Sequence, residues 1–142
     1  MAKQSGLGMR VQVDDAGGVA RNISNDLDSI DFSTPRGTQD ITGLDKSAME
    51  TLLLLADGKA TFKGTLNAAA NMSHDVFKTV PSTSVTRTVT IDLPPLVTGS
   101  PRLAMEMVLT DYQVTRGNDG KLTFSVPAQL ADGTVPTWAT QP

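Results

Sequence analysis

The sequence predicts a mainly β protein, and three observations support this fold class. Threonine occurs 18 times among the 142 residues, and its β-branched side chain suits a pleated surface better than a helix. Several short segments alternate apolar and polar residues with the period of two that is typical of strands. Clusters of glycine, proline, asparagine and aspartate separate these segments, as turns do. A chain of this length is expected to form one domain, spanning residues 1–142.

The first third of the chain predicts short strands and one long loop. Apolar and polar residues alternate from Met9 to Val13, and the turn sequence DDAGG follows. Pro35 and Gly37 later interrupt the alternation, so residues 33–43 are predicted to be a long exposed loop, a feature that usually has a function. The strands expected in this region cover residues 9–13, 19–23 and, less regularly, 27–32.

Residues 45–57, DKSAMETLLLLAD, predict the most strongly signalled helix. Asp45 is placed to cap its free amides, and Asp57 with the following glycine would end it. Leu54 and Leu55 fall outside its apolar face, so we infer a second buried surface, such as the edge of a neighbouring subunit. The alternative is a helix between its own sheet and a covering loop. The apolar face has the spacing i, i+3, i+4, i+7 and consists of Met49, Leu52, Leu53 and Ala56.

The remaining residues predict four more strands and a short helix. The clearest strand is SVTRTVTIDL, residues 84–93, in which valine, isoleucine and leucine occupy one face and threonine the other. Arg87 is the exception on the apolar face. A strand over 103–116 is expected to turn through GNDG into KLTFSVP, residues 121–127. The tail holds too many turn residues for a regular element. A further strand is expected over 60–66, and the short helix over 73–79.

Charge and aromatic content argue against several binding classes. The net charge is -3 and the sequence pI about 4.9, whereas gripping nucleic acid requires lysine and arginine for the phosphates. Four Phe, one Tyr and one Trp are too few for a stacking platform. The longest apolar run, Leu52 to Ala56, is far shorter than the ~20 residues of a membrane span. The start also lacks the apolar core of a signal peptide, so we expect a protein made and kept in a cytoplasm.

The sequence offers little chemistry for catalysis or cofactors. It has no cysteine, and His74 is its single histidine, which at the start of a short helix is expected to be solvated or capping. Asp26, Asp28 and Asp31 lie close together, but without the glycine and glutamate of a calcium loop they are expected to form a solvated acidic edge. We therefore expect no catalytic residue, no cofactor and no bound metal.

Four segments together resemble the tail tube proteins, or major tail proteins, of long-tailed bacteriophages. The combination of DITGLDKSAME with the ending RGNDGKLTFSVPAQLADGTVPTW is the most specific part, and the resemblance covers nearly the whole chain. Many members append an immunoglobulin-like domain, and because the sequence stops near Pro142 we expect none here. The four segments are MAKQSGLG, SIDFSTPRGTQDITGLDKSAMETLLLLADGKATFKGTLN, SHDVFKTVPSTSVTRTVTIDL and VLTDYQVTRGNDGKLTFSVPAQLADGTVPTW.

The resemblance implies a β-sandwich or partial β-barrel with a flanking helix, six copies to a ring, and rings stacked into a hollow tube. The tube would be the conduit for genome delivery, with DNA passing through without specific binding. The implied location is the virion tail, after synthesis in a bacterial host cytoplasm. The implied partners are further copies of the chain and the tape measure, terminator and distal tail proteins, with no membrane partner.

Roles for individual residues follow from this resemblance. Met49, Leu52 and Leu53 would cover the subunit's own sheet. Arms of about residues 1–8 and 133–142 and the loop of about 33–43 would become ordered on assembly. The expected subunit-interface residues are Pro35, Arg36, Thr38, Gln39, Leu54, Leu55 and Trp138. The expected lumen-lining residues are Thr86, Thr88, Thr90, Asp92 and Glu106.

Three alternatives remain open at the level of sequence. A tail terminator or head-to-tail joining protein would form one ring but would not stack indefinitely. A small carbohydrate-binding β-sandwich belongs to a different class, and the scarcity of aromatic residues argues against it. An unrecognised hydrolase is the last.

Overall fold

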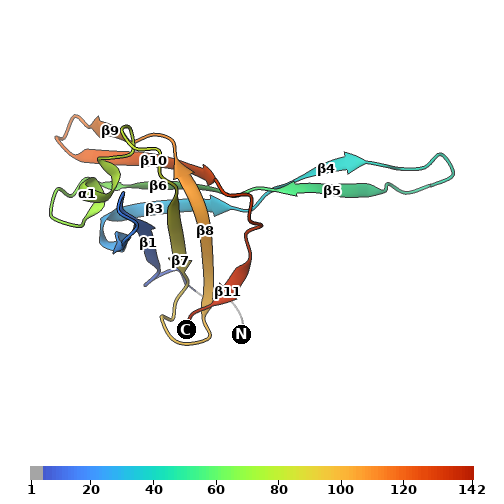
Figure 1. Ribbon diagram of the computed structural model, residues 1–142, viewed down its shortest axis with the longest axis horizontal. Coiled ribbons are helices and arrows are strands. Elements are labelled where there is room, and N and C mark those ends of the chain that lie inside the picture. The colour runs from blue at the N-terminus through green and yellow to red at the C-terminus, as the bar shows by residue number, and fades with distance from the viewer. Residues whose placement is uncertain (1–4) are drawn as a thin grey trace.

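The structure, a computed structural model, describes residues 5–142 and confirms a mainly β chain. Its body is one antiparallel sheet of nine strands, and a second sheet of two strands projects from it as a long hairpin (Figure 1). In chain order the elements are β1 (Arg10–Asp14), β2 (Ala20–Asn22), the 3₁₀ turn η1 (Ser24–Asp26), β3 (Leu27–Ser33), β4 (Arg36–Asp40), β5 (Thr51–Ala56), β6 (Lys59–Thr65), α1 (Ser73–Phe77), β7 (Arg87–Asp92), β8 (Pro101–Leu109), β9 (Gln113–Arg116), β10 (Leu122–Leu130) and β11 (Trp138–Thr140).

Most of the predicted elements are present, with ends that differ by a few residues. The five strands expected over 9–13, 19–23, 27–32, 60–66 and 84–93 correspond to β1, β2, β3, β6 and β7. The short helix expected over 73–79 is α1. The GNDG hairpin is also confirmed, because β9 pairs with β10 and the Gly117 N–H donates to the Lys121 carbonyl at 2.9 Å.

The main sheet bends where β8 meets β10. Its strand order is β2-β1-β7-β8-β10-β6-β3, with β9 also pairing β10 and β11 also pairing β8. Only Ala128–Leu130 of β10 pair with β8, whereas β10 pairs with β6 over seven residues. Figure 1 shows β10, β6 and β3 running across the direction of β7 and β8. The sheet therefore folds over itself into two crossed layers, as in a partial barrel.

The hydrophobic core lies between these layers and is closed by α1. Alternate residues of β1, β6, β7, β8 and β10 point into it, which accounts for the period of two in their sequences. Phe77 of α1 stacks on Phe62 of β6 with ring centroids 6.2 Å apart, and its centroid is 5.6 Å from that of Phe124. Removal of one such ring from a core typically costs about 3 to 5 kcal/mol.

The prediction of a helix over residues 45–57 is wrong. Residues 51–56 form β5, and the residues before them form the open tip of the hairpin. A short, continuous apolar run does not distinguish a strand from a helix by its period. A strand is favoured here because β3 and β6 already pair in the body. Their pairing continues into the hairpin through a hydrogen bond of 2.9 Å from the Asp57 N–H to the Pro35 carbonyl. The loop predicted over 33–43 likewise contains β4.

Two further expectations near the C-terminus are corrected. The single strand predicted over 103–116 is broken between β8 and β9. The break lies opposite Pro127 of β10, which accepts a hydrogen bond from the Thr110 N–H but has no N–H to donate. The tail was expected to contain no regular element, yet residues 138–140 form β11 against Pro101–Leu103 of β8.

Candidate self-assembly surfaces

The β4–β5 hairpin extends the β3–β6 pair beyond the body of the protein (Figure 1). The ladder runs from Ser33 opposite Lys59, through the Asp57–Pro35 hydrogen bond, to Arg36 opposite Ala56. The hairpin is therefore hydrogen-bonded to the body through two continuous strands and is not a separate loop. Its tip, residues 41–50, is exposed almost throughout.

An irregularity in the hairpin adds one residue to β5. The pairs Arg36–Ala56 and Thr38–Leu53 leave Leu54 and Leu55 opposite the single residue Gly37, which is the arrangement of a β-bulge. The Arg36 guanidinium donates two hydrogen bonds to the carbonyl oxygen of Leu54, at 3.0 and 2.8 Å. The arginine thus satisfies a carbonyl at the irregular part of the ladder, and this gives Arg36 a structural role within its own subunit.

The hairpin carries leucine side chains that the rest of the described chain leaves about half exposed or more. Leu54 is 41% exposed and Leu55 is 89% exposed. Leu53 shares a face with Thr38, whereas Leu52 and Leu54 lie on the opposite face by strand alternation. The expectation that Met49, Leu52 and Leu53 cover the subunit's own sheet is wrong, because they are 75%, 46% and 55% exposed. An exposed apolar ribbon of this kind is typical of a contact surface.

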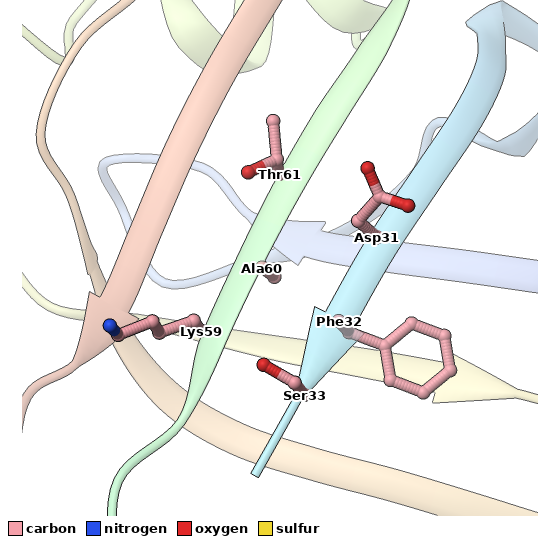
Figure 2. Close-up of a pocket in the computed structure, with 6 residues that line it drawn as sticks. All are labelled: Asp31, Phe32, Ser33, Lys59, Ala60 and Thr61. Carbon is pink, nitrogen blue, oxygen red and sulfur yellow. The ribbon is translucent and has the colours of Figure 1, made fainter. Parts of the chain in front are cut away.

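The root of the hairpin carries a shallow pocket and an exposed tryptophan. Figure 2 shows the pocket across the paired ends of β3 and β6, with Asp31, Phe32 and Ser33 on one strand and residues 59–61 on the other. The Phe32 ring lies against Trp138 of β11, with centroids 6.2 Å apart, and Trp138 is still 51% exposed. Trp138 and the hairpin residues Pro35, Arg36, Thr38 and Gln39 are therefore all available to a second molecule.

The polar face of β7 and β8 holds the residues expected to line a lumen. Thr88 and Thr90 are half-buried, Thr86 just before β7 is exposed, and Glu106 of β8 is half-buried. The Thr88 hydroxyl donates to the Glu106 carboxylate at 2.7 Å. The predicted division of this strand into an apolar and a polar face is confirmed, since Val89 and Ile91 are fully buried.

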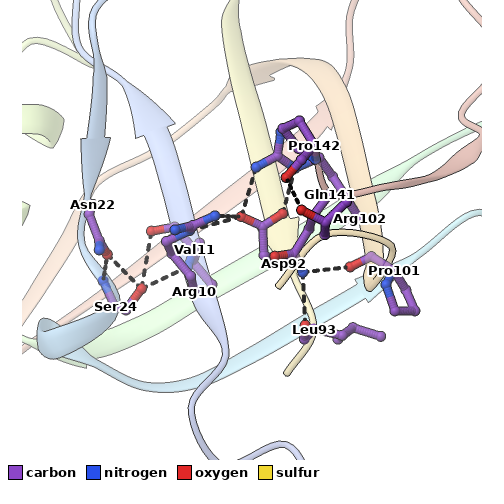
Figure 3. A network of polar contacts seen from close by, with 11 residues as sticks. Arg10, Val11, Asn22, Ser24, Asp92, Leu93, Pro101, Arg102, Gln141 and Pro142 are labelled. Carbon is purple, nitrogen blue, oxygen red and sulfur yellow. Dashed lines mark hydrogen bonds and ion pairs between the residues drawn. The ribbon is translucent and has the colours of Figure 1, made fainter. Parts of the chain in front are cut away.

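Asp92 is on this polar face but does not present a free charge. Its side chain is fully buried between Arg10 of β1 and Arg102 of β8 (Figure 3). Arg102 Nε donates at 2.6 Å and Arg10 Nη2 at 2.7 Å. The hydrogen bonds from Arg102 and then Arg10 hold the pKa of Asp92 below its ordinary value. The expectation of an acidic wall residue at position 92 is therefore wrong, because the two arginines enclose and neutralise it.

Three arginines that the sequence did not single out for this purpose organise the polar contacts. Arg10 and Arg102 face Asp92 because the register aligns all three residues in one row across β1, β7 and β8. Arg87, the exception noted on the apolar face, is buried and donates to the carbonyl oxygen of Val76 at 2.6 Å and to Thr79 Oγ1 at 2.9 Å. Burial lowers the pKa of Arg87. The only sign of this buried role in the sequence is the charge of Arg87 on an otherwise apolar strand face.

The three aspartates considered as calcium ligands do not come together. Asp26 is buried, with one carboxylate oxygen accepting from the Ser73 N–H at 3.0 Å and the other from Asn67 Nδ2 at 2.9 Å. Asp28 and Asp31 are exposed on β3. Across residues 5–142 no group of three or more histidine or acidic side chains is arranged to hold a metal ion. The same residues contain no helix with the length and apolarity of a membrane span.

Similarity to known proteins is found in structure and not in sequence. No protein-family model and no curated protein matches the chain. A solved structure described as the virion of a native gene transfer agent particle contains a chain that superposes with a TM-score of 0.75 at 12% identity. A second, the tail of an empty gene transfer agent particle determined with helical refinement and C6 symmetry, gives 0.75 at 14% identity. Each match covers 99% of this chain and 100% of the other, so the fold is shared end to end.

Proposed function

We propose that the protein is a structural subunit of a phage-like tail, and specifically of its tail tube. Six copies would form a ring, and rings would stack into a hollow conduit for genome delivery. The observation that carries the proposal is the end-to-end fold similarity to a chain of a particle tail that has C6 symmetry. The role is structural and not catalytic. It places the protein in the virion tail after synthesis in a bacterial host.

The exposed hairpin supports self-assembly. Its leucines are uncovered in one copy, and burial of apolar surface stabilises association by roughly 25 cal/mol per Å² before the costs of binding. We propose that Leu54 and Leu55 face a neighbouring subunit, together with Pro35, Thr38, Gln39 and Trp138. Arg36 would contribute through its contact with Leu54. The expected arm of about residues 1–8 and the part of the arm 133–142 that precedes β11 would gain order on assembly, since residues 138–140 already pair with β8 in the single subunit; residues 1–4 lie outside the described part of the chain.

The proposed lumen is lined by the polar face of β7 and β8. Thr86, Thr88, Thr90 and Glu106 offer hydroxyl groups and one carboxylate, which do not pair with phosphates as lysine or arginine would. Asp92 is left out of this set because its charge is compensated within the subunit. DNA would therefore pass the wall without specific binding. The remaining proposed partners are the tape measure, terminator and distal tail proteins at the two ends of the tube.

Electron microscopy of the purified protein, concentrated until it assembles, tests this function. Long tubes with six-fold symmetry in cross-section are the expected result, because a subunit with an uncovered contact surface on a projecting element continues to add copies. Single rings that never stack would instead assign the protein to a tail terminator or a head-to-tail joining position. A protein that stays monomeric at all concentrations would contradict the proposal.

A further inference from the structure

An apolar groove lies at the end of β3 that is remote from the hairpin. It has a volume of about 490 Å³ and runs between the segment of residues 6–9 and the first residues of β3. Leu7 on its rim is 85% exposed, and Met9, Leu27 and Ile30 are only partly buried. The remaining lining residues are Gly6, Gly8, Val11, Ser24, Asp28 and Ser29. The groove is thus an open surface lined by five apolar side chains together with polar residues.

The free edge of β3 lies beside this groove. In the strand order of the main sheet β3 is terminal, and among the described residues it pairs with β6 alone. The opposite edge of the sheet is β2, which has only three residues. An open edge of seven residues presents unpaired backbone N–H and C=O groups to a further strand. The groove and the edge together are suited to an apolar strand.

The β4–β5 hairpin has the complementary properties. It is a two-stranded sheet, so each of its strands also has a free edge. Leu52 and Leu54 project from one face and are about half exposed. Residues 36–56 carry three carboxylates, at positions 40, 45 and 50, against two cations, whereas Lys63 and Lys121 lie close to the groove, opposite Ser29 and beside Asp28 respectively. Because Lys121 is paired with Asp28 on the groove itself, charge does not decide the contact, which depends on the apolar side chains and the free strand edges.

The hairpin and the groove of one copy cannot meet. The groove is at the Leu27–Ile30 end of β3, and the hairpin leaves the body after Ser33, at the other end of the same strand. Figure 1 shows β4 and β5 pointing away from the body along the line of β3 and β6. A hairpin that fills a groove must therefore belong to a second copy. Such a head-to-tail contact repeats from copy to copy, and it forms a ring or a filament.

We propose that the hairpin of one copy docks into this groove of the next copy. Leu52 and Leu54 would pack against Leu7, Met9 and Ile30, and one edge of the hairpin would pair with the free edge of β3. This inference rests on the proposed self-assembling tail function and identifies the receiving surface. It commits to a second copy of this chain as the occupant.

Cysteine cross-linking tests the pairing directly, because the chain has no cysteine of its own. The test variant carries Leu54→Cys and Leu7→Cys, which place one thiol on the leucine face of the hairpin and one on the rim of the groove. The control carries Leu54→Cys and Thr90→Cys, with the second thiol on the polar face of β7. Both are assembled, treated with a mild oxidant and run on a denaturing gel. We expect a ladder of covalent dimers and larger oligomers from the first, at least tenfold stronger than from the control.

A charged variant on the rim of the groove gives an independent measure. Leu7 is 85% exposed, so Leu7→Asp should leave thermal unfolding of the subunit unchanged while it lowers assembly at least tenfold. Equal cross-linking of the two cysteine pairs in well-formed tubes, or normal assembly of Leu7→Asp, would overturn the docking while leaving the tail function in place. A wild-type chain that does not assemble at all would overturn the tail function, and the docking with it.

Discussion

Two buried carboxylates hold the polar parts of this β-rich body together. Asp92 joins β1, β7 and β8 through two arginines. Asp26 joins η1 to the start of α1, where Met72 at the N-cap position makes no side-chain hydrogen bond of its own. In both cases a residue distant in sequence supplies an acceptor that local residues do not. Each contact therefore forms only when the tertiary structure is in place.

Replacing Asp92 by Asn should lower the free energy of unfolding at pH 7 by about 2 kcal/mol, since two arginines then lose a buried charged partner. The pKa of Asp92 is below its ordinary value in the folded state, so its contribution is complete above the unfolded-state pKa of about 3.9 and is lost as the pH falls through the lower folded-state pKa. Urea unfolding from pH 7 to pH 2 should show the two proteins converging below about pH 4.

Asp28→Asn is the matched control for this series. Asp28 is exposed, and its Oδ2 is 3.8 Å from Lys121 Nζ, so its removal should change the unfolding free energy by less than about 0.5 kcal/mol. A difference between wild type and Asp92→Asn that stays constant down to pH 2 would show that the carboxylate charge is not the cause.

Replacing Asp26 by Ala should lower the free energy of unfolding by about 2 kcal/mol, because the Ser73 N–H and Asn67 Nδ2 lose their acceptor inside the protein. Hydrogen exchange should speed up first in residues 73–77. Asp75→Ala serves as the control, since Asp75 is on the same helix but half exposed and paired with Lys78. Equal effects of the two substitutions would refute the special role of Asp26.

At the scale of elements, the β3–β6 pair is the axis of the molecule, since it closes one edge of the body and continues into the hairpin. Gly64 is essential to it at the irregularity between Leu27 and Ser29. A Cβ atom at position 64 would overlap the backbone carbonyl of Asp26. The strands approach this closely because glycine has no side chain.

Gly64→Ala is accordingly expected to lower the free energy of unfolding by about 3 kcal/mol through overpacking of the backbone. Gly37→Ala in the hairpin is the matched control, because the nearest atom to its new methyl group would be Leu54 Cβ at an ordinary 3.5 Å. Chemical denaturation of both variants measures the difference. A small effect at both positions would mean that the bulge relaxes freely.

Substitution of the hairpin leucines should separate folding from assembly. Leu52→Asp, Leu54→Asp and Leu55→Asp each place a charge on an exposed position, so unfolding free energies should change by only about 0.5 kcal/mol. Assembly should be lost, because a neighbouring copy would have to bury that carboxylate. Circular dichroism and sedimentation distinguish the two effects. Ile91→Asp in the core should unfold the subunit, and any hairpin variant that unfolds in the same way would contradict an exposed ribbon.

The strands that sequence predicts well are those with one buried face. In β1 and β7 the core imposes an alternation that is visible in the residues themselves. β5 has no covered face within the subunit, and its run of leucines carries no such alternation, so the sequence predicts a helix there. The role of Asp92 was missed for a related reason. Its arginine partners are 82 and 10 residues away, and only the strand register brings them together.

At the scale of the whole molecule, the polar face of β7 and β8 carries Arg102, which is paired with Asp92, and the carboxylate of Glu106. If this face lines a tube, Glu106→Lys should leave tail assembly intact and slow genome release, because about six added cations per ring would pair with phosphates. The effect should be strongest at low salt, since the Debye length is only about 8 Å at 0.15 M. Release kinetics from intact particles at several salt concentrations are the measurement.

Asp119→Lys is the control for charge alone, because it makes the same change in the exposed turn between β9 and β10. Equal slowing by both variants would show that the effect does not come from the wall. Unchanged release with Glu106→Lys would remove this face from the conduit.

The distance along the chain between β1 and its partner β7 affects how the protein folds during synthesis. β1 ends at residue 14 and β7 begins at residue 87, so at roughly 5 to 20 residues per second a ribosome needs about 4 to 15 s to make the partner after the first strand has emerged. During this interval the apolar side of β1 has no strand from β7 to cover it. The β4–β5 hairpin, whose strands are close in sequence, can form much earlier. A nascent chain therefore exposes the leucines of the β4–β5 hairpin before its core is closed. A chaperone would protect the chain during this interval.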